Sequence, residues 1–160
     1  MRKGSWKLIT EMFASHIAIL INRYDVCADG HDGHLHWLGW TNGEEDTKTI
    51  VAFDLGSETF REIPLPDSTL DHNRSNVVGV LAGKLCVMSY IEDVAYEVWV
   101  MDEYAVAESW VKRHVFSQFI GYTYPFGFTS HREFLTEGDG YLVLYNPSTN
   151  EHKYLEDHCP

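Results

Sequence analysis

The sequence predicts an all-β fold of β-propeller-like repeats, each a unit of four antiparallel strands, incomplete at its N-terminus. One pattern, an apolar run followed by a polar turn and a mixed apolar and charged run, occurs three times in 160 residues. Turn signals recur about every ten residues. The pattern repeats with a period of about 40–50 residues, which is typical of four-stranded propeller blades.

The three copies of the pattern share one physical logic. They are residues 51–66 (VAFDLGSETFREIPLP), 98–111 (VWVMDEYAVAESWV) and 143–155 (VLYNPSTNEHKYL). Asp54 in the first copy corresponds to Asn146 in the third, and Asp102 holds this position in the second. The first run of each copy is β-branched and aromatic, as a buried strand is. The second run alternates in polarity and predicts a half-exposed outer strand.

A second hairpin is expected upstream of each copy. Its compact turns are predicted at residues 30–33, 82–84 and 130–132. Segment 10–20, TEMFASHIAIL, fits either a helix or a pair of strands, and its position before a hairpin favours strands. The predicted units are approximately residues 11–66, 67–117 and 118–156, within a single domain spanning residues 1–160. The chain opens on an apparent outer strand, SWKLIT, without inner strands of its own, so a longer protein is expected.

The chain is acidic, with 12 Lys and Arg against 24 Asp and Glu and a net charge of −12. Such a surface repels phosphate backbones, so nucleic-acid binding is not expected; it suits a basic partner, or solubility alone. The apolar run at residues 17–21 is far shorter than the ~20 residues of a membrane span. The three cysteines have no CxxC spacing and follow no secretory signal, which predicts reduced thiols in the cytoplasm or nucleus. Cys86, within LCVMSY, is expected to fill the core.

Four ordered segments carry a specific resemblance. They are GHLHWLGW at residues 33–40, IVAFDLGSETFREIPLP at 50–66, GKLCVMSY at 83–90 and EVWVMDEYAVAESWVKRHVF at 97–116. This series resembles the F-box-associated domain of plant F-box proteins, a group that includes the S-locus F-box proteins and kelch-like relatives. In that family a G-x-x-H-W strand precedes I-x-x-F-D and F-x-x-[IL]-P-x-P strands. The next unit carries W-V-M-x-E-Y-G-x-x-x-S-W. The resemblance covers residues 5–155.

The resemblance implies a non-catalytic substrate-recognition domain of an SCF-type ubiquitin ligase, which binds a target protein for ubiquitination. A Skp-type adaptor and a cullin would be reached only through an N-terminal F-box, and this sequence contains no F-box motif. The alternatives are a stand-alone interaction module without ligase coupling, a non-functional truncated copy, or a glycan-binding propeller. A second departure is Ala105, which stands where the family has glycine. If that turn requires a positive φ, alanine is strained there.

No metal, cofactor or catalytic site is expected. His31, His34 and His36 lie close together in DGHDGHLHW, beside Asp29 and Asp32. On a strand, His34 and His36 face the same side, which permits zinc ligation, but no further Cys or His pair completes a tetrahedral site. The resemblance assigns His36 to an inner strand position. Neither a nucleophile elbow nor a phosphate-binding loop is present, so the chain is not expected to be an enzyme.

One candidate contact for a partner is the acidic loop at residues 41–48, TNGEEDTK. It holds Glu44, Glu45 and Asp46. Long loops on a rigid scaffold carry function in some proteins and are solvated connectors in others. Both interpretations stay open for this loop.

The other candidate is the aromatic stretch YTYPFGF at residues 122–128. The alternation of a strand places Tyr122 and Tyr124 on one face with Phe126 and Phe128. Such a face either anchors a peptide or packs between blades.

Overall fold

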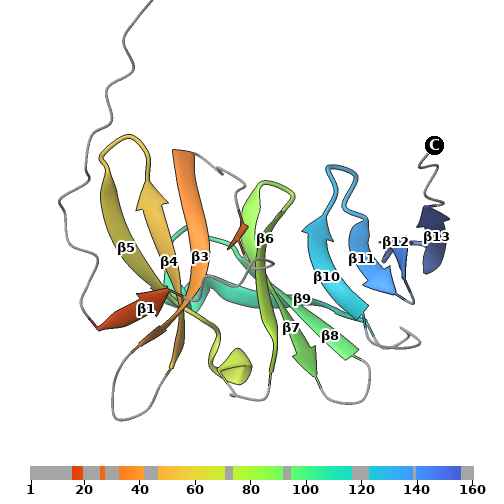
Figure 1. Cartoon of the computed structure of the whole chain (residues 1–160), viewed down its shortest axis with the longest axis horizontal. Helices are drawn as coiled ribbons and strands as arrows, with labels where there is room; N and C mark the ends of the chain where they lie inside the picture. The colour runs from red at the N-terminus through yellow and green to blue at the C-terminus, as the bar shows by residue number, and fades with distance from the viewer. Residues whose placement is uncertain are drawn as a thin grey trace, which may run out of the picture.

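The computed structural model describes residues 16–19, 26–27, 33–41, 47–70, 74–91, 95–116, 123–138 and 140–155 (Figure 1). Within these ranges thirteen strands form three antiparallel sheets, and no α-helix occurs. The predicted all-β architecture is therefore confirmed. Among the same residues, no helix has the length and apolar character that crossing a membrane requires.

The first sheet contains five short strands, two of which share one position. They are β1 (Ile17–Ile19), β2 (Val26–Cys27), β3 (His34–Thr41), β4 (Lys48–Asp54) and β5 (Thr59–Pro64). Both β1 and β2 pair antiparallel with β3, β1 near its end and β2 near its beginning. Since β4 pairs along the other edge of β3, β1 and β2 together occupy the innermost position of a four-strand unit. The prediction of strands before this hairpin is confirmed at Ile17–Ile19.

The middle sheet is a regular meander of β6 (Asn76–Leu81), β7 (Lys84–Ile91), β8 (Ala95–Met101) and β9 (Trp110–Phe116). Its first hairpin closes on Ala82 and Gly83, with φ values of 52° and 76°. Two residues with positive φ form the tight turn whose twist matches that of the strands. The turn predicted at residues 82–84 is confirmed.

The third sheet repeats the meander with β10 (Thr123–Phe128), β11 (Phe134–Gly138), β12 (Tyr141–Asn146) and β13 (Glu151–Leu155). The turn predicted at residues 130–132 lies between β10 and β11, where Arg132 has a φ of 63°. In Figure 1 the three sheets stand side by side, and β6 contacts both β3 and β10. Face-to-face sheets with adjacent inner strands form a propeller-like arrangement. The unit boundaries and the incompleteness of the fold stay predictions.

The middle sheet is buried on both faces because β7 points alternate side chains to opposite neighbours. Leu85 and Val87 pack in a cluster with residues of the first sheet, whereas Cys86 and Met88 pack in a cluster with Phe134 of the third. The sequence of a strand covered on both faces is a nearly continuous apolar run, as KLCVMSY is. Cys86 is fully buried, as expected for a core residue.

Polar contacts also join the first and middle sheets. The indole Nε1 of Trp110 donates to the carbonyl of Pro64, at 2.9 Å, where β5 ends. The amide Nδ2 of Asn76 donates to the carbonyl of Thr69, at 2.9 Å, in the link between the sheets. These bonds satisfy buried polar groups at the junction, and losing one partner would leave the other desolvated.

The third sheet has one face that points away from the middle sheet. Leu135, Leu144 and Leu155 are half-buried there, and Leu142 is 37% exposed. By strand register, this face corresponds to the face of the middle sheet that the third sheet covers. Glu137 and Lys153 lie on the same face, so the described row of sheets ends on a surface of leucines with two charged residues among them.

Candidate protein-binding surface

The antiparallel strands sort the connections onto two edges of the molecule (Figure 1). One edge, called here the turn edge, carries the connections β4–β5, β6–β7, β8–β9, β10–β11 and β12–β13. The opposite edge carries β3–β4, β7–β8 and β11–β12, together with the links between sheets. Loops on a rigid scaffold are the usual place for partner recognition. The turn edge is the better described of the two.

The β4–β5 turn is held by a side chain within it. Oδ1 of Asp54 accepts hydrogen bonds from the backbone N–H groups of Gly56, at 2.7 Å, and Ser57, at 2.9 Å. These two bonds hold the pKa of the Asp54 carboxyl below its ordinary value, and the bond from Ser57 has the larger effect. The turn then passes through Glu58, which has a φ of 56°. Asp is suited to this turn because its short side chain can bond to the backbone two residues on.

The β12–β13 turn uses the same device. Oδ1 of Asn146 accepts from the backbone N–H groups of Ser148, at 2.9 Å, and Thr149, at 3.3 Å. Asn150 has a φ of 59° and matches Glu58 in position. The correspondence of Asp54 with Asn146 in the sequence repeat is thus a correspondence of turn geometry.

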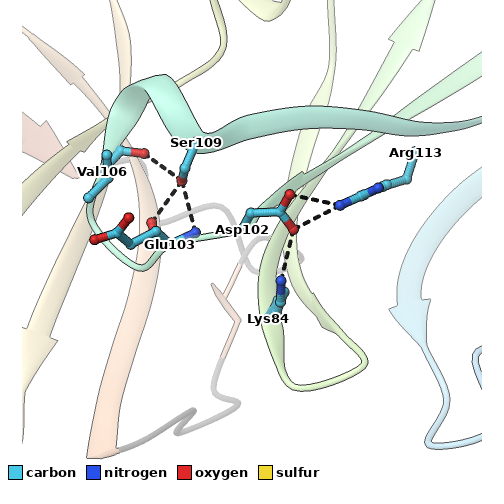
Figure 2. Close-up of polar contacts among 6 residues, drawn as sticks. All are labelled: Lys84, Asp102, Glu103, Val106, Ser109 and Arg113. Carbon is cyan, nitrogen blue, oxygen red and sulfur yellow. Dashed lines mark hydrogen bonds and ion pairs between the residues drawn. The ribbon is translucent and has the colours of Figure 1, made fainter.

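The β8–β9 loop is longer and is held by a different residue (Figure 2). The hydroxyl of Ser109 bonds to the backbone N–H of Glu103, at 3.0 Å, and lies 2.8 Å and 2.7 Å from the carbonyls of Glu103 and Val106. The backbone N–H of Asp102 donates to the carbonyl of Ser109, at 3.0 Å, and closes the loop. Ser109 therefore bonds to the backbone of this loop, as Asp54 and Asn146 bond to the backbone of their own turns.

The carboxylate of Asp102 is consequently directed elsewhere (Figure 2). Nζ of Lys84 donates to its Oδ1 at 2.8 Å, and Nη2 of Arg113 lies 2.9 Å from Oδ1 and 2.7 Å from Oδ2. The hydrogen bonds from Lys84 and then Arg113 hold the pKa of the Asp102 carboxyl below its ordinary value. This group, called here the Asp102 cluster, joins the start of β7, the residue that follows β8, and β9 at the turn edge.

The expected strain at Ala105 is present. Ala105 has a φ of 61°, in the left-handed region that disfavours a Cβ. Its neighbour Tyr104 turns toward the first sheet, where its hydroxyl lies 3.0 Å from Nε2 of the buried His36. Trp110, directly after the loop, also contacts the first sheet. The loop is therefore fixed at both ends against the neighbouring sheet.

The two described histidines of the metal hypothesis have other contacts. Nε2 of His34 lies 3.5 Å from Oδ2 of Asp54, and the His34 ring packs at a tilt against Tyr104 with centroids 4.9 Å apart. His36 bonds to the Tyr104 hydroxyl. Among the residues that the structure describes, no group of three or more potential ligands is arranged to hold a metal ion. His31, Asp29 and Asp32 lie outside those residues, and the expectation of no metal or cofactor site stays a prediction.

The expectation that four aromatic residues share one strand face is wrong. The β10–β11 register pairs Tyr124 with Glu137 and Phe128 with Phe134, and it shifts between Pro125 and Gly127. This β-bulge inserts one extra residue and reverses the alternation, so positions 124 and 128 lie on opposite faces. Phe128 packs against Phe134 with centroids 5.6 Å apart, while Phe126, inside the bulge, is 49% exposed.

The proposed contact residues themselves are little described. Glu44, Glu45, Asp46 and Tyr122 lie outside the described residues, and Tyr124 is described only in its backbone. Their roles as contacts stay predictions.

The Asp102 cluster was not found from the sequence. A signal for it does exist, because Asp54 and Asn146 are each followed by small turn residues at the second and third positions, whereas Asp102 is followed there by Tyr104 and Ala105. An Asp at a turn position that is not followed by turn-forming residues indicates a side chain with another role.

A family model described as the F-box associated beta propeller domain matches residues 1–156. The chain belongs to this family. The four segments that carry the resemblance in sequence thus identify the correct family. The F-box associated fold also agrees with the three face-to-face antiparallel sheets.

The relatives of this F-box associated chain are plant proteins of Arabidopsis thaliana. It is 30% identical over 118 residues to the F-box protein At4g22390, and 35% identical over 124 residues to the F-box protein CPR1. Each alignment covers 70% of this chain and 29% of the relative. Identity to the F-box/kelch-repeat protein At3g23880 is 26% over 123 residues, covering 77% of this chain and 33% of the relative. The chain thus spans about a third of the length of these relatives.

Proposed function

We propose that this F-box associated domain recognises the target protein of an SCF-type ubiquitin ligase and has no catalytic activity of its own. The observation that carries the proposal is the family match over residues 1–156, together with relatives that are F-box proteins. In this role the domain binds the target, while a Skp-type adaptor and a cullin are reached through an F-box. Action in the cytoplasm or nucleus is part of this proposal.

The geometry supports a binding role in physical terms. Three sheets buried against one another form a stiff scaffold, and the turn edge presents fixed loops on it. The β8–β9 loop is held by Ser109, by Tyr104 and by Trp110, so its conformation is established before any partner arrives. A loop that is already ordered loses little conformational entropy on binding.

The test is a reconstituted ligase. The full chain is fused behind the F-box segment of its relative CPR1, and proteins whose lifetime falls on expression of the fusion are identified by quantitative mass spectrometry. Each is then offered to the fusion with purified adaptor, cullin, ubiquitin and conjugating enzymes. We expect at least one protein to receive ubiquitin from the fusion, and none from the F-box segment alone.

Two other results would change the conclusion. If a protein binds the chain with micromolar or better affinity but receives no ubiquitin from the fusion, the alternative of a stand-alone interaction module is correct. If no protein binds the chain at all, both hypotheses fail, and a truncated copy without function and a glycan-binding propeller are the remaining explanations.

A further inference from the structure

The middle sheet departs from the repeat at the end of β8. At the equivalent positions in the other two sheets, Oδ1 of Asp54 and Oδ1 of Asn146 accept backbone N–H groups of their own turns. In the middle sheet Ser109 holds the loop, and the Asp102 carboxylate takes no part in it. The loop does not need Asp102, so the contacts of that side chain call for a different explanation.

A second departure lies opposite, in β9. The pairing of β8 with β9 runs from Val98–His114 directly to Trp99–Lys112, which leaves Arg113 as the extra residue of a β-bulge. The corresponding pairs β4–β5 and β12–β13 have no bulge. A bulge re-aims the side chain of its extra residue. Here the side chain that it re-aims is the one that reaches Asp102.

Both departures bring two cations to one exposed carboxylate (Figure 2). The side chains of Lys84 and Arg113 are 46% and 47% exposed. Both described hydrogen bonds of Arg113 come from Nη2, so its Nε and Nη1 donors meet no acceptor among the described residues. Lys84 uses one of the three N–H groups of its ammonium on Asp102. The Asp102 cluster therefore keeps donors directed to solvent.

The charge of the cluster favours an anion. Two cations around one carboxylate leave a net charge of +1, on a chain whose net charge is −12. Exposed ion pairs add little to stability, because solvent screens them and long side chains lose entropy on pairing. The stability of the fold therefore explains the two departures from the repeat poorly. Recognition of a negatively charged group explains both.

We propose that the Asp102 cluster is an anion anchor, in which Lys84 and Arg113 bind an oxyanion of the target polypeptide, either a side-chain carboxylate or a phosphorylated side chain. The planar guanidinium of Arg113 suits the geometry of both groups. Asp102 is a positioning residue that holds the two cations in place. This inference rests on the proposed function, since it names the chemistry by which the domain would recognise its target.

The test uses three fluorescein-labelled peptides on one Gly-Ser backbone. One carries three Glu, one carries three phosphoserines and one carries three Gln. Affinity for the full chain is measured by fluorescence anisotropy, and the site by the NMR signals of the Arg113 Nε–H and the backbone amides. We expect the Glu or the phosphoserine peptide to shift the signals of Lys84, Asp102 and Arg113 saturably, and the Gln peptide to leave them unchanged. Whichever charged peptide binds more tightly identifies the source of the oxyanion.

The matched variants are Arg113→Gln and Arg61→Gln. Arg61 is exposed on β5, the outer strand of the first sheet, so the two variants change the net charge equally. Arg113→Gln should weaken binding of the charged peptide about tenfold, and Arg61→Gln less than twofold; thermal melting checks that both remain folded. Equal affinities for the two variants, or shifts scattered over all Lys and Arg residues, would show non-specific attraction only and overturn the anchor.

The failure of this inference is distinguishable from failure of the proposed function. Peptide binding requires neither ubiquitin nor an identified target. If the ligase fusion with Arg113→Gln modifies its target as fast as the original fusion, the ligase role stands and the anchor is wrong. If the peptides bind at the cluster but no protein is ubiquitinated, the site stands and the ligase role is wrong.

Discussion

The β4–β5 turn and the β8–β9 loop begin at equivalent residues and solve the same problem in different ways. In the first, the Asp54 side chain accepts two backbone N–H groups of its own turn. In the second, Ser109 satisfies the backbone of a longer loop from its far end, and Asp102 bonds to Lys84 and Arg113 instead. Moving the structural task to another residue leaves the original residue open to a new role.

Replacing the tryptophan that anchors the β8–β9 loop should have the largest effect. Trp110→Ala removes a buried ring between the first and middle sheets and its bond to the Pro64 carbonyl. It should lower the free energy of unfolding by about 3–5 kcal/mol, measured by urea denaturation. Trp110→Phe keeps most of the ring and should lose much less; equal losses would mean that the hydrogen bond, not the packing, carries the anchor.

Ser109→Ala should distinguish the β8–β9 loop from the β4–β5 turn by its cost in stability. Removing the hydroxyl leaves the Glu103 N–H without its partner and takes one of two donors from the Val106 carbonyl, which keeps the backbone N–H of residue 109. The expected cost is about 1–2 kcal/mol. The matched change Ser57→Ala in the β4–β5 turn should cost less than about 0.5 kcal/mol, since Asp54 holds that turn. Comparable losses in chemical denaturation would refute the division of tasks described above.

Ala105→Gly should stabilise the protein. The φ of 61° places the alanine Cβ in a crowded conformation that glycine adopts freely. The free energy of unfolding should rise by about 1 kcal/mol. The nearby Ala107→Gly, in the short 3-10 turn Ala107–Ser109, should lower it by about 0.5–1 kcal/mol. A decrease for Ala105→Gly in thermal or urea melts would show that the positive φ carries no strain.

The smallest effect concerns the two carboxylates. Both Asp54 and Asp102 have folded-state pKa values below the ordinary 3.8. Each therefore contributes stability that is present above pH 3.8 and is lost as the pH falls through its folded pKa. Backbone N–H groups cause the shift at Asp54, whereas Lys84 and Arg113 cause it at Asp102. Because salt screens exposed charges, about 1 M NaCl should raise the pKa of Asp102 more than that of Asp54.

Carboxyl NMR titrations at low and high salt measure this difference directly. The Arg113→Gln variant is the control, and it should raise the pKa of Asp102 while leaving Asp54 unchanged. Equal salt responses at the two carboxyls would mean that the ion pairs of Asp102 do not persist in solution.

Strand patterning made most of the fold predictable. The alternation of apolar residues, the turn at residues 82–84 and the four-strand period predict the sheets, because each depends on local chemistry or on the repeat itself. The two β-bulges were not predictable in this way. Each depends on one extra residue in the pairing of two strands, and period-two alternation in a single strand contains no information on its partner. This is why Tyr124 and Phe128 were wrongly expected on one face.

The candidate site was less predictable than the fold. Its two cations come from β7 and β9, and only the folded sheet brings Lys84 and Arg113 to Asp102. The family resemblance marked Ala105 and the strain there, since that position matches a glycine in a motif. It gave no indication of the Asp102 cluster, because Asp102 stands at the variable position of the motif.

The middle sheet, covered on both faces, has a consequence for how the protein unfolds. Its strands supply side chains to both interfaces, so neither outer sheet can separate without exposing one buried face of the middle sheet. In a row of units stabilised by nearest-neighbour contacts, the central unit couples the others. Backbone amides in β7 should exchange with solvent only on global unfolding, and those in β13 through local opening. A partner that clamps the middle sheet would thereby slow the opening of the whole domain.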